Sequence, residues 1–245
     1  MPEPRRLKHA PIREAVVDIR VPPVPPSSLD ALRELAKGLE YPVVHEAFEF
    51  LGQFNLGPQG MMAQGQQSRP SGFRAVSESR SQIVQFRLNG MAVSRLEPYE
   101  SWEQLVAEAK QLWLAFREAA HPEGATRLGL RYINHVRVPY PGSDLRDYFA
   151  GLPDLPKEWP QAVSSFLFRQ TLHDDLTGAA VNITHALADD VDEDRIGVIF
   201  DIDAYREASF GVDDPELWGT FGDLRDLKNR IFFSGVTEAT LSLCD

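Results

Sequence analysis

The sequence predicts an α+β protein built from a β-α-β(3–4)-α unit that occurs twice. In this fold the strands form one curved antiparallel sheet, and the helices cover one of its faces. Three observations predict it: each half begins with an alternating strand, each half ends with a long helical segment, and residues recur at a nearly constant offset. We expect residues 1–123 and 124–245 to be the two halves, packed as one globular unit.

The first half opens with a half-buried strand. Ile12–Val21 alternates apolar and polar residues, and the proline run Pro22–Pro26 ends it. Ser27 or Ser28 can cap a short helix that reaches about Lys37. Val43–Leu51 is consistent with a strand, and the Gln-, Ser- and Gly-rich stretch Gln64–Ser71 predicts an exposed loop.

A hairpin and a long helix complete this half. Strands are expected at Gly72–Ser79, Ile83–Leu88 and Met91–Leu96, and Asn89-Gly90 predicts a type I′ turn with positive φ at both residues. Ser101 and Gln104 form a capping box, which starts a helix that runs to His121-Pro122.

The second half repeats this order. Arg127–Val138 alternates as a strand, and Ser143 precedes a short helix. Asp214-Pro215 starts a final long helix. Between the two helices we expect three strands, at Val163–Leu172, Ala179–Leu187 and Ile196–Ala204.

Identities between the halves support a duplication. They fall at an offset of 116 or 117 residues, at strand ends, caps and helix starts. Arg20-Val21-Pro22 matches Arg137-Val138-Pro139; Pro25, Ser27 and Leu29 match Pro141, Ser143 and Leu145; Trp102 and Phe116 match Trp218 and Phe232. Two similar but unrelated units are the alternative.

Charge, hydropathy and the cysteine count argue against several classes of protein. The net charge is −11, and residues 189–216 alone carry −9, so the acidity is local. No basic tract exceeds a dipeptide, which disfavours non-specific nucleic-acid binding. No apolar stretch reaches the roughly 18 residues of a membrane span. The single cysteine, Cys244, excludes an intrachain disulfide, so we expect a cytoplasmic protein.

One strand carries the strongest candidate binding site. The alternation of Arg127–Val138 places Arg127, Arg131, His135 and Arg137 on one face, with Gly129 between the first two. These side chains are suited to binding an anion or an acidic partner segment. The alternative is that the arginines pair with carboxylates on neighbouring strands, such as Glu14 and Asp18.

A metal site is the weaker candidate. Asp201 and Asp203 share one strand face, and oxygen ligands suit a divalent cation. A solvated acidic turn at Asp189–Asp194 is the plain alternative. The histidines show no metal-binding spacing, and no phosphate-binding glycine loop or serine nucleophile motif occurs, so neither a cofactor nor a catalytic residue is predicted.

Three segments resemble a sporadically distributed family of uncharacterised bacterial proteins of about 250 residues. The patterns are Pro11-Ile12-x-Glu14, Pro98-Tyr99-x-x-Trp102 and Arg127-x-Gly129-x-Arg131-Tyr132-Ile133-Asn134. The resemblance implies one bacterial protein unit, with a hint of accessory or defence-type gene clusters, and supplies no catalytic residues. The predicted topology is also similar to the saddle of the TATA-binding protein, although the acidic second half lacks that protein's basic face.

These observations favour a non-catalytic binding protein that captures a protein partner or a small anionic ligand. The alternative is a divalent-metal-dependent enzyme acting on a phosphoester, with Asp201 and Asp203 as ligands.

Overall fold

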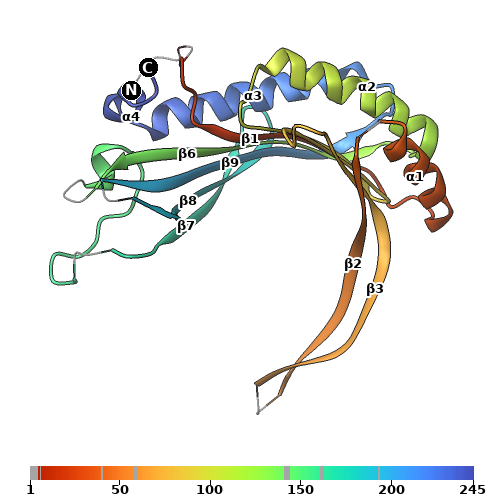
Figure 1. The fold of residues 1–245 in the computed structure, drawn as a ribbon, viewed down its shortest axis with the longest axis horizontal. Coiled ribbons are helices and arrows are strands. Elements are labelled where there is room, and N and C mark those ends of the chain that lie inside the picture. Colours follow the sequence, from red (N-terminus) through yellow and green to blue (C-terminus); the bar gives the residue numbers. More distant parts are fainter. Residues whose placement is uncertain are drawn as a thin grey trace.

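The fold is α+β, with an open, curved nine-stranded antiparallel sheet and four α-helices in the part of the chain described (Figure 1). The computed structural model describes residues 5, 7–39, 41–57, 60–140, 144–160, 163–192 and 194–245. The strands are β1 (Ile12–Arg20), β2 (Val43–Gly57), β3 (Gly60–Val76), β4 (Gln82–Arg87), β5 (Gly90–Leu96), β6 (Ala125–Pro139), β7 (Leu167–Asp174), β8 (Ala179–Val191) and β9 (Arg195–Phe210). The helices are α1 (Leu29–Lys37), α2 (Trp102–Ala120), α3 (Pro215–Gly235) and α4 (Glu238–Ser242), with 3₁₀ turns η1 (Pro26–Ser28) and η2 (Leu145–Asp147).

The two alternating strands predicted to open the halves lie side by side at the centre of the sheet. The strand order is β2-β3-β4-β5-β1-β6-β9-β8-β7, and β1 pairs antiparallel with β6, with Ala15 opposite Tyr132. Alternate residues of both strands, such as Val17 and Leu130, are fully buried against the helical layer. The helices lie on the convex side of the sheet, so the opposite face is concave and open (Figure 1).

Helices α2 and α3 begin where the sequence predicts and pack antiparallel to each other. The Ser101 hydroxyl accepts a hydrogen bond from Gln104 N, and the Asp214 carboxylate accepts one from Glu216 N. The partly buried Trp102 ring lies under Arg225 of α3, and the Trp218 ring lies under Lys110 of α2. These reciprocal contacts join the helical cover of the two halves.

The predicted loop at Gln64–Ser71 is wrong, because these residues belong to β3. Strand β3 pairs with β4 only from Gly72 to Val76, whereas its pairing with β2 extends to Gly60. The two strands therefore leave the sheet as a long ribbon (Figure 1). Ribbon strands away from a core need no apolar face, so their composition can match that of a loop.

The turn at Asn89-Gly90 is also not the one expected. Arg87 pairs with Gly90, so the two loop residues are Leu88 and Asn89, and Asn89 is not among the positive-φ residues. Gly90 has φ +135° and lies in β5, where a Cβ would come within 2.1 Å of the Ile19 carbonyl oxygen of β1. The glycine is required by the close approach of β1 rather than by a type I′ turn.

The remaining elements follow the expected order with shifted ends. Asp144, instead of the predicted Ser143, caps η2, its carboxylate accepting a hydrogen bond from Arg146 N; residues 141–143 lie outside the described ranges. Strand β7 starts at Leu167, four residues after the predicted start, and α4 was not predicted. Among the described residues, no helix is both long and apolar enough to cross a membrane.

Candidate functional site

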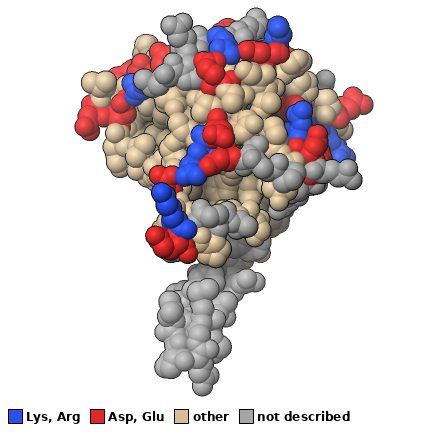
Figure 2. Space-filling view, turned by 90° about the vertical axis from the view of Figure 1, so that its left-hand side faces the viewer, with Lys and Arg blue, Asp and Glu red and all other residues tan. Residues whose placement is uncertain are grey.

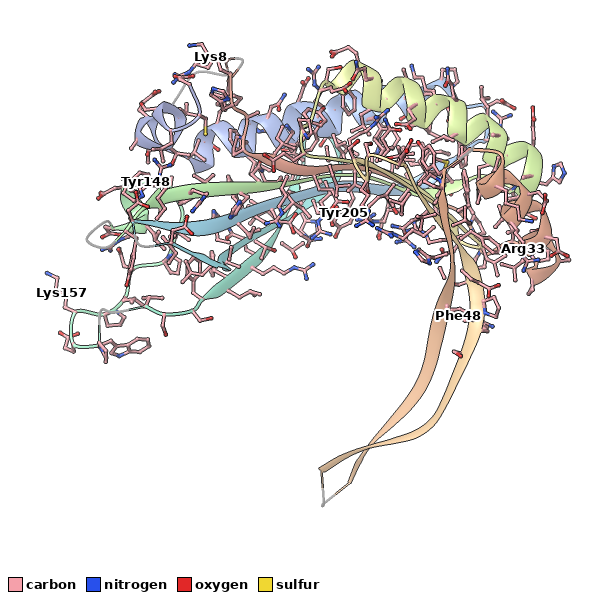
Figure 3. The ribbon with its side chains drawn as sticks, in the orientation of Figure 1. Lys8, Arg33, Phe48, Tyr148, Lys157 and Tyr205 are labelled. Atoms are coloured by element: carbon pink, nitrogen blue, oxygen red, sulfur yellow. The ribbon has the colours of Figure 1, made fainter. Side chains whose placement is uncertain are left out.

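A row of arginines and glycines crosses the concave face at the centre of the sheet. Successive strand pairings place Gly72 opposite Arg87, Arg87 opposite Gly90, Gly90 opposite Arg20, and Arg20 opposite Arg127. Directly paired residues point to the same side of a sheet. Glycines therefore lie on both sides of Arg87, whereas Arg20 and Arg127 are direct cross-strand neighbours. Nitrogen-rich side chains project from this underside of the sheet, beside Tyr205 (Figure 3).

Three of these side chains converge on one carboxylate. Asp18 accepts hydrogen bonds from Arg20 Nε at 2.8 Å, Arg87 Nη2 at 2.5 Å and Arg127 Nη1 at 3.4 Å. We call Arg20, Arg87 and Arg127 the arginine cluster. The sheet surface beside Asp18 is flat, because the residues paired with Asp18 on the two neighbouring strands are Ala92 and Gly129, which have a small side chain and none. The guanidinium groups can therefore lie flat against the sheet around Asp18.

Arg127 bridges the two halves of the sheet. Its guanidinium lies over Gly129, where a Cβ would be only 2.7 Å from Arg127 Nη1. It stacks on the Tyr205 ring at 4.3 Å from the centroid and contacts Asp203 at 3.4 Å. Asp203 also accepts a hydrogen bond from Asn182 Nδ2. Stacking and two carboxylates hold this guanidinium in place.

Arg87 is the most enclosed member of the cluster. Its side chain is 17% exposed, and its buried Nε has no hydrogen-bond partner among the described residues. Burial lowers the pKa of Arg87, and Asp18 acts in the opposite direction. A buried guanidinium nitrogen without an acceptor is costly, so Arg87 is held in the cluster by its Nη2 contact with Asp18 at the expense of its Nε donor.

The other three residues predicted on the basic face of β6, which are Arg131, His135 and Arg137, already have interaction partners. Arg131 donates two hydrogen bonds to Asp201, at 2.6 and 2.9 Å, and this pairing raises the pKa of Arg131. Arg137 donates to Asp192, and His135 also has an interaction partner. The four predicted residues therefore divide: Arg127 belongs to the cluster, while among the described residues Arg131 pairs with Asp201 and Arg137 with Asp192. The alternative drawn from the sequence, pairing of the arginines with carboxylates on neighbouring strands, is confirmed for Arg127 with Asp18 of β1 and Asp203 of β9, and for Arg131 with Asp201 of β9.

The two predicted metal-ligand candidates lie on the same concave face, and both receive hydrogen bonds from arginine. Asp201 is held by Arg131, and Asp203 by Arg127 and Asn182. Within the described ranges, no three His, Cys, Asp or Glu side chains are grouped as a metal site requires. Binding a cation here would need both carboxylates to exchange an arginine for the metal.

The sequence reasoning named Arg127 but missed Arg20 and Arg87. Arg20 has the same parity as Asp18 in the alternating strand, which could have indicated it. Arg87 joins the cluster only because the β4–β5 hairpin pairs beside β1, and that register is not visible in a single strand.

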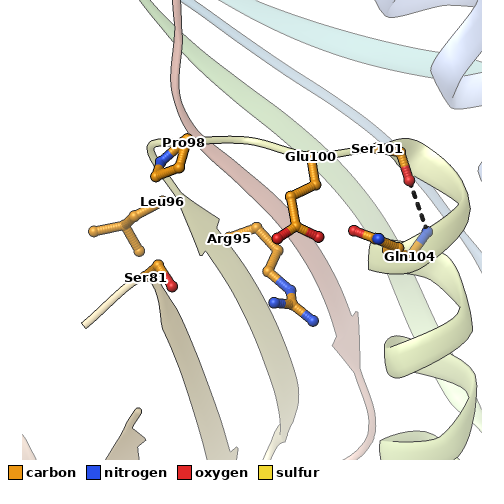
Figure 4. A pocket seen from close by; sticks show the side chains of 7 residues that line it. All are labelled: Ser81, Arg95, Leu96, Pro98, Glu100, Ser101 and Gln104. Carbon is orange, nitrogen blue, oxygen red and sulfur yellow. Dashed lines mark hydrogen bonds between the residues drawn. The ribbon is translucent and has the colours of Figure 1, made fainter. Parts of the chain in front are cut away.

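Two other groups of polar side chains, at the start of α2 and under α3, are held by contacts with neighbouring residues. A shallow pocket at the start of α2 contains Arg95, which is held by Glu108 at 2.7 Å, and Ser101, which caps the helix (Figure 4). Under α3, the Lys228 ammonium lies 3.7 Å from the Tyr132 ring centroid, and burial lowers its pKa to about 7. The Tyr132 hydroxyl is hydrogen-bonded to that of Tyr99.

His185 is a second buried titratable group on the helical side. It is 2% exposed, neither ring nitrogen has a hydrogen-bond partner, and its ring stacks on Phe200 at 4.5 Å. Burial lowers its pKa to about 4. Aromatic packing, rather than a ligand, therefore accounts for its position.

Comparison with known proteins identifies no relative from which a role could be carried over: no family model matches the chain, and no curated protein is significantly similar to it.

Proposed function

We propose that this protein is a non-catalytic binding protein whose concave face captures a carboxylate or phosphate group at the arginine cluster. The observation that carries the proposal is the convergence of Arg20, Arg87 and Arg127 on the single carboxylate of Asp18. The ligand is either a small anion or an acidic segment of a partner protein, since both present the same chemical group.

The balance of charge and donors supports an anionic ligand. Three guanidinium groups face two carboxylates, Asp18 and Asp203, which leaves one positive charge over. Each guanidinium carries five N–H donors, far more than these two carboxylates can accept. Anion recognition by arginine is strongest where several such donors are held in place in advance.

A second part of the proposal concerns the fold. We propose that the chain is a duplicated unit with a saddle-like shape, whose pseudo-twofold axis passes near the Ala15–Tyr132 pair. The offset of 117 between these residues equals that between Arg20 and Arg137, which supports this relation. The arginine cluster would then lie to one side of the axis, because Arg20 and Arg127 pair five residues along the strands from Ala15 and Tyr132.

The test is calorimetric titration at low ionic strength with two probes, inorganic phosphate and a short polyglutamate peptide, with a polylysine peptide as the charge control. The wild-type protein should bind phosphate, polyglutamate or both, and not polylysine. Phosphate alone would indicate a small-molecule ligand, whereas much tighter binding of polyglutamate would indicate an acidic segment.

Arg20→Gln and Arg137→Gln are matched variants on the same face. Arg20→Gln should weaken binding about tenfold or more, because it removes a charge-assisted donor from the cluster. Arg137→Gln should leave the affinity nearly unchanged. Equal losses in both variants, or no binding of either anion by the wild type, would refute the proposal. The alternative of a metal-dependent phosphoester enzyme stays a prediction, tested by titrating Mg²⁺ and Mn²⁺ into wild type and Asp201→Asn.

A further inference from the structure

The sheet has one more strand on one side of its central pair than on the other. Counted outward from the central β1–β6 pair, one side continues through β5, β4, β3 and β2, and the other through β9, β8 and β7. Strand β3 is thus covered by β2, whereas β7, at the same distance from the centre, pairs only with β8 in the part of the chain that the structure describes (Figure 1). The outer side of β7 is an open edge next to an unoccupied strand position.

Strand β7 lacks two of the features that usually protect an edge, a proline and a bulge. It contains no proline, its ladder with β8 has no register shift, and Arg169 is its only Lys or Arg. The opposite edge strand, β2, differs in having two irregularities in its ladder with β3. Each edge strand contains two charged residues, Arg169 and Asp174 in β7 and Glu46 and Glu49 in β2. Natural sheets block unwanted pairing by bulges, prolines and charges, so the contrast points to β7 as a pairing edge.

Apolar side chains are exposed along this edge. Leu167 is 72% exposed and Leu172 is 45% exposed, and Leu176 in the following turn is more exposed still. Trp159 and Val163, in the segment that leads into β7, are also exposed. Figure 2 shows the end of the molecule on the left of Figure 1, where uncharged side chains cover much of the surface and basic and acidic ones lie next to each other.

The sequence of β7 is complementary to itself in one antiparallel register. With Gln170 opposite Gln170 of a second copy, Phe168 faces Leu172, Leu167 faces His173 and Arg169 faces Thr171, each pair occurring twice. Shifting the centre to Thr171 would place Arg169 opposite His173 and Phe168 opposite Asp174. Cross-strand pairs of aromatic and aliphatic residues stabilise a sheet, and the first register has no like-charged pair.

We infer that β7 pairs with β7 of a second copy of this chain, which joins two sheets into one around a twofold axis through Gln170. Charge supports a second copy as the occupant. The protein has a net charge of −11, whereas residues 167–174 carry one Arg and one Asp and are neutral. This edge is therefore a place where two acidic molecules can approach with little repulsion, and a twofold contact closes as a dimer.

Sedimentation velocity of the full chain over a wide range of concentration tests this inference. The wild type should form a dimer, and Leu167→Lys and Leu172→Lys should each raise its dissociation constant about tenfold or more. Leu114→Lys is the control and should leave dimerisation unchanged, because Leu114 lies on α2 and its exposure, 54%, is between those of the two test leucines. A monomer at every concentration, or equal weakening by all three variants, would overturn the inference. Species larger than a dimer would indicate head-to-tail pairing of β7 with β2, and would also overturn it.

Cross-linking tests the register separately. Gln170→Cys should form a disulfide-linked dimer on mild oxidation, because residue 170 faces itself across the axis, and Thr171→Cys should not. The native Cys244 is buried and does not compete. Cross-linking by Thr171→Cys alone would contradict the proposed register. The outcome is independent of the proposed anion binding, whose variants lie at the centre of the sheet.

Discussion

The guanidinium of Arg127 lies over Gly129, two residues further along the same strand, in the space that a side chain at position 129 would fill. A Cβ there would stand 2.7 Å from Arg127 Nη1, and the atoms it would meet belong to a flexible side chain rather than to the backbone. The pattern Arg-x-Gly therefore has a physical reason in this strand: the glycine lets the arginine lie flat between Asp18 and Tyr205.

Gly129→Ala should separate binding from stability. The new methyl group displaces the Arg127 guanidinium from the cluster, so the affinity for phosphate or polyglutamate should fall several-fold. The free energy of unfolding should change by about 1 kcal/mol or less, because alanine suits a strand better than glycine and the arginine can move. Urea denaturation and calorimetry on the same sample measure both. Unchanged affinity would show that the position of Arg127 does not matter.

Gly90→Ala should destabilise the protein by about 3 kcal/mol or more. The added Cβ meets the backbone of β1, and φ +135° is strained for any other residue. Asn89→Ala is the control, with an expected loss of about 0.5 kcal/mol, because Asn89 does not adopt positive φ. Denaturant titration of both variants distinguishes this account from a type I′ turn, in which Asn89 would also be sensitive.

The stability of the protein should decrease as the pH falls from about 6.5 to about 4, through His185. Its folded-state pKa is lowered to about 4, below the ordinary value of 6.5. The unfolded chain therefore binds more protons in this window, and stability is complete above it and lost as the pH falls. The contribution is about 3 kcal/mol.

His185→Phe removes the titrating ring and keeps aromatic packing against Phe200. Its urea midpoint should fall less than that of the wild type between pH 7 and pH 4.5. Parallel curves for the two proteins would assign the acid sensitivity to other groups.

Cys244 should be inert in the native protein. It is 4% exposed, and burial, with a smaller effect of Asp245, raises the pKa of its thiol to about 11. Thiolates rather than thiols react with alkylating agents, so labelling by iodoacetamide at pH 8 should need denaturant. Rapid labelling without denaturant would show that the C-terminal segment opens readily.

The elements with a strong local signal could be predicted from the sequence. The alternation of Ile12–Val21 predicted β1, and Ser101 and Asp214-Pro215 predicted the starts of α2 and α3, because each signal depends on neighbouring residues alone. The ribbon at residues 60–71 could not be predicted in the same way, because β3 pairs with β4 only from Gly72 onward and a strand that extends beyond the sheet needs no period of two.

The candidate site was predictable only in part. Arg127 stands out in its own strand, and Asp18 was named as a pairing partner. Arg87 reaches Asp18 from two strands away, across β5, and this depends on the order and register of three strands. Sheet order is a property of the whole chain, so a motif search along the sequence does not find such a cluster.

The most direct test of the account is the phosphate affinity of Asp18→Asn, measured by calorimetry beside Asp201→Asn. Asp18 occupies the arginine cluster as an internal anion, and neutralising it removes a repulsive charge within a few ångströms of the ligand. Asp18→Asn should therefore bind phosphate about tenfold or more tightly than the wild type. Asp201→Asn, which frees only Arg131, should bind phosphate as the wild type does. Equal affinities for wild type and Asp18→Asn, or a larger gain in Asp201→Asn, would contradict the claim that the cluster is the anion site.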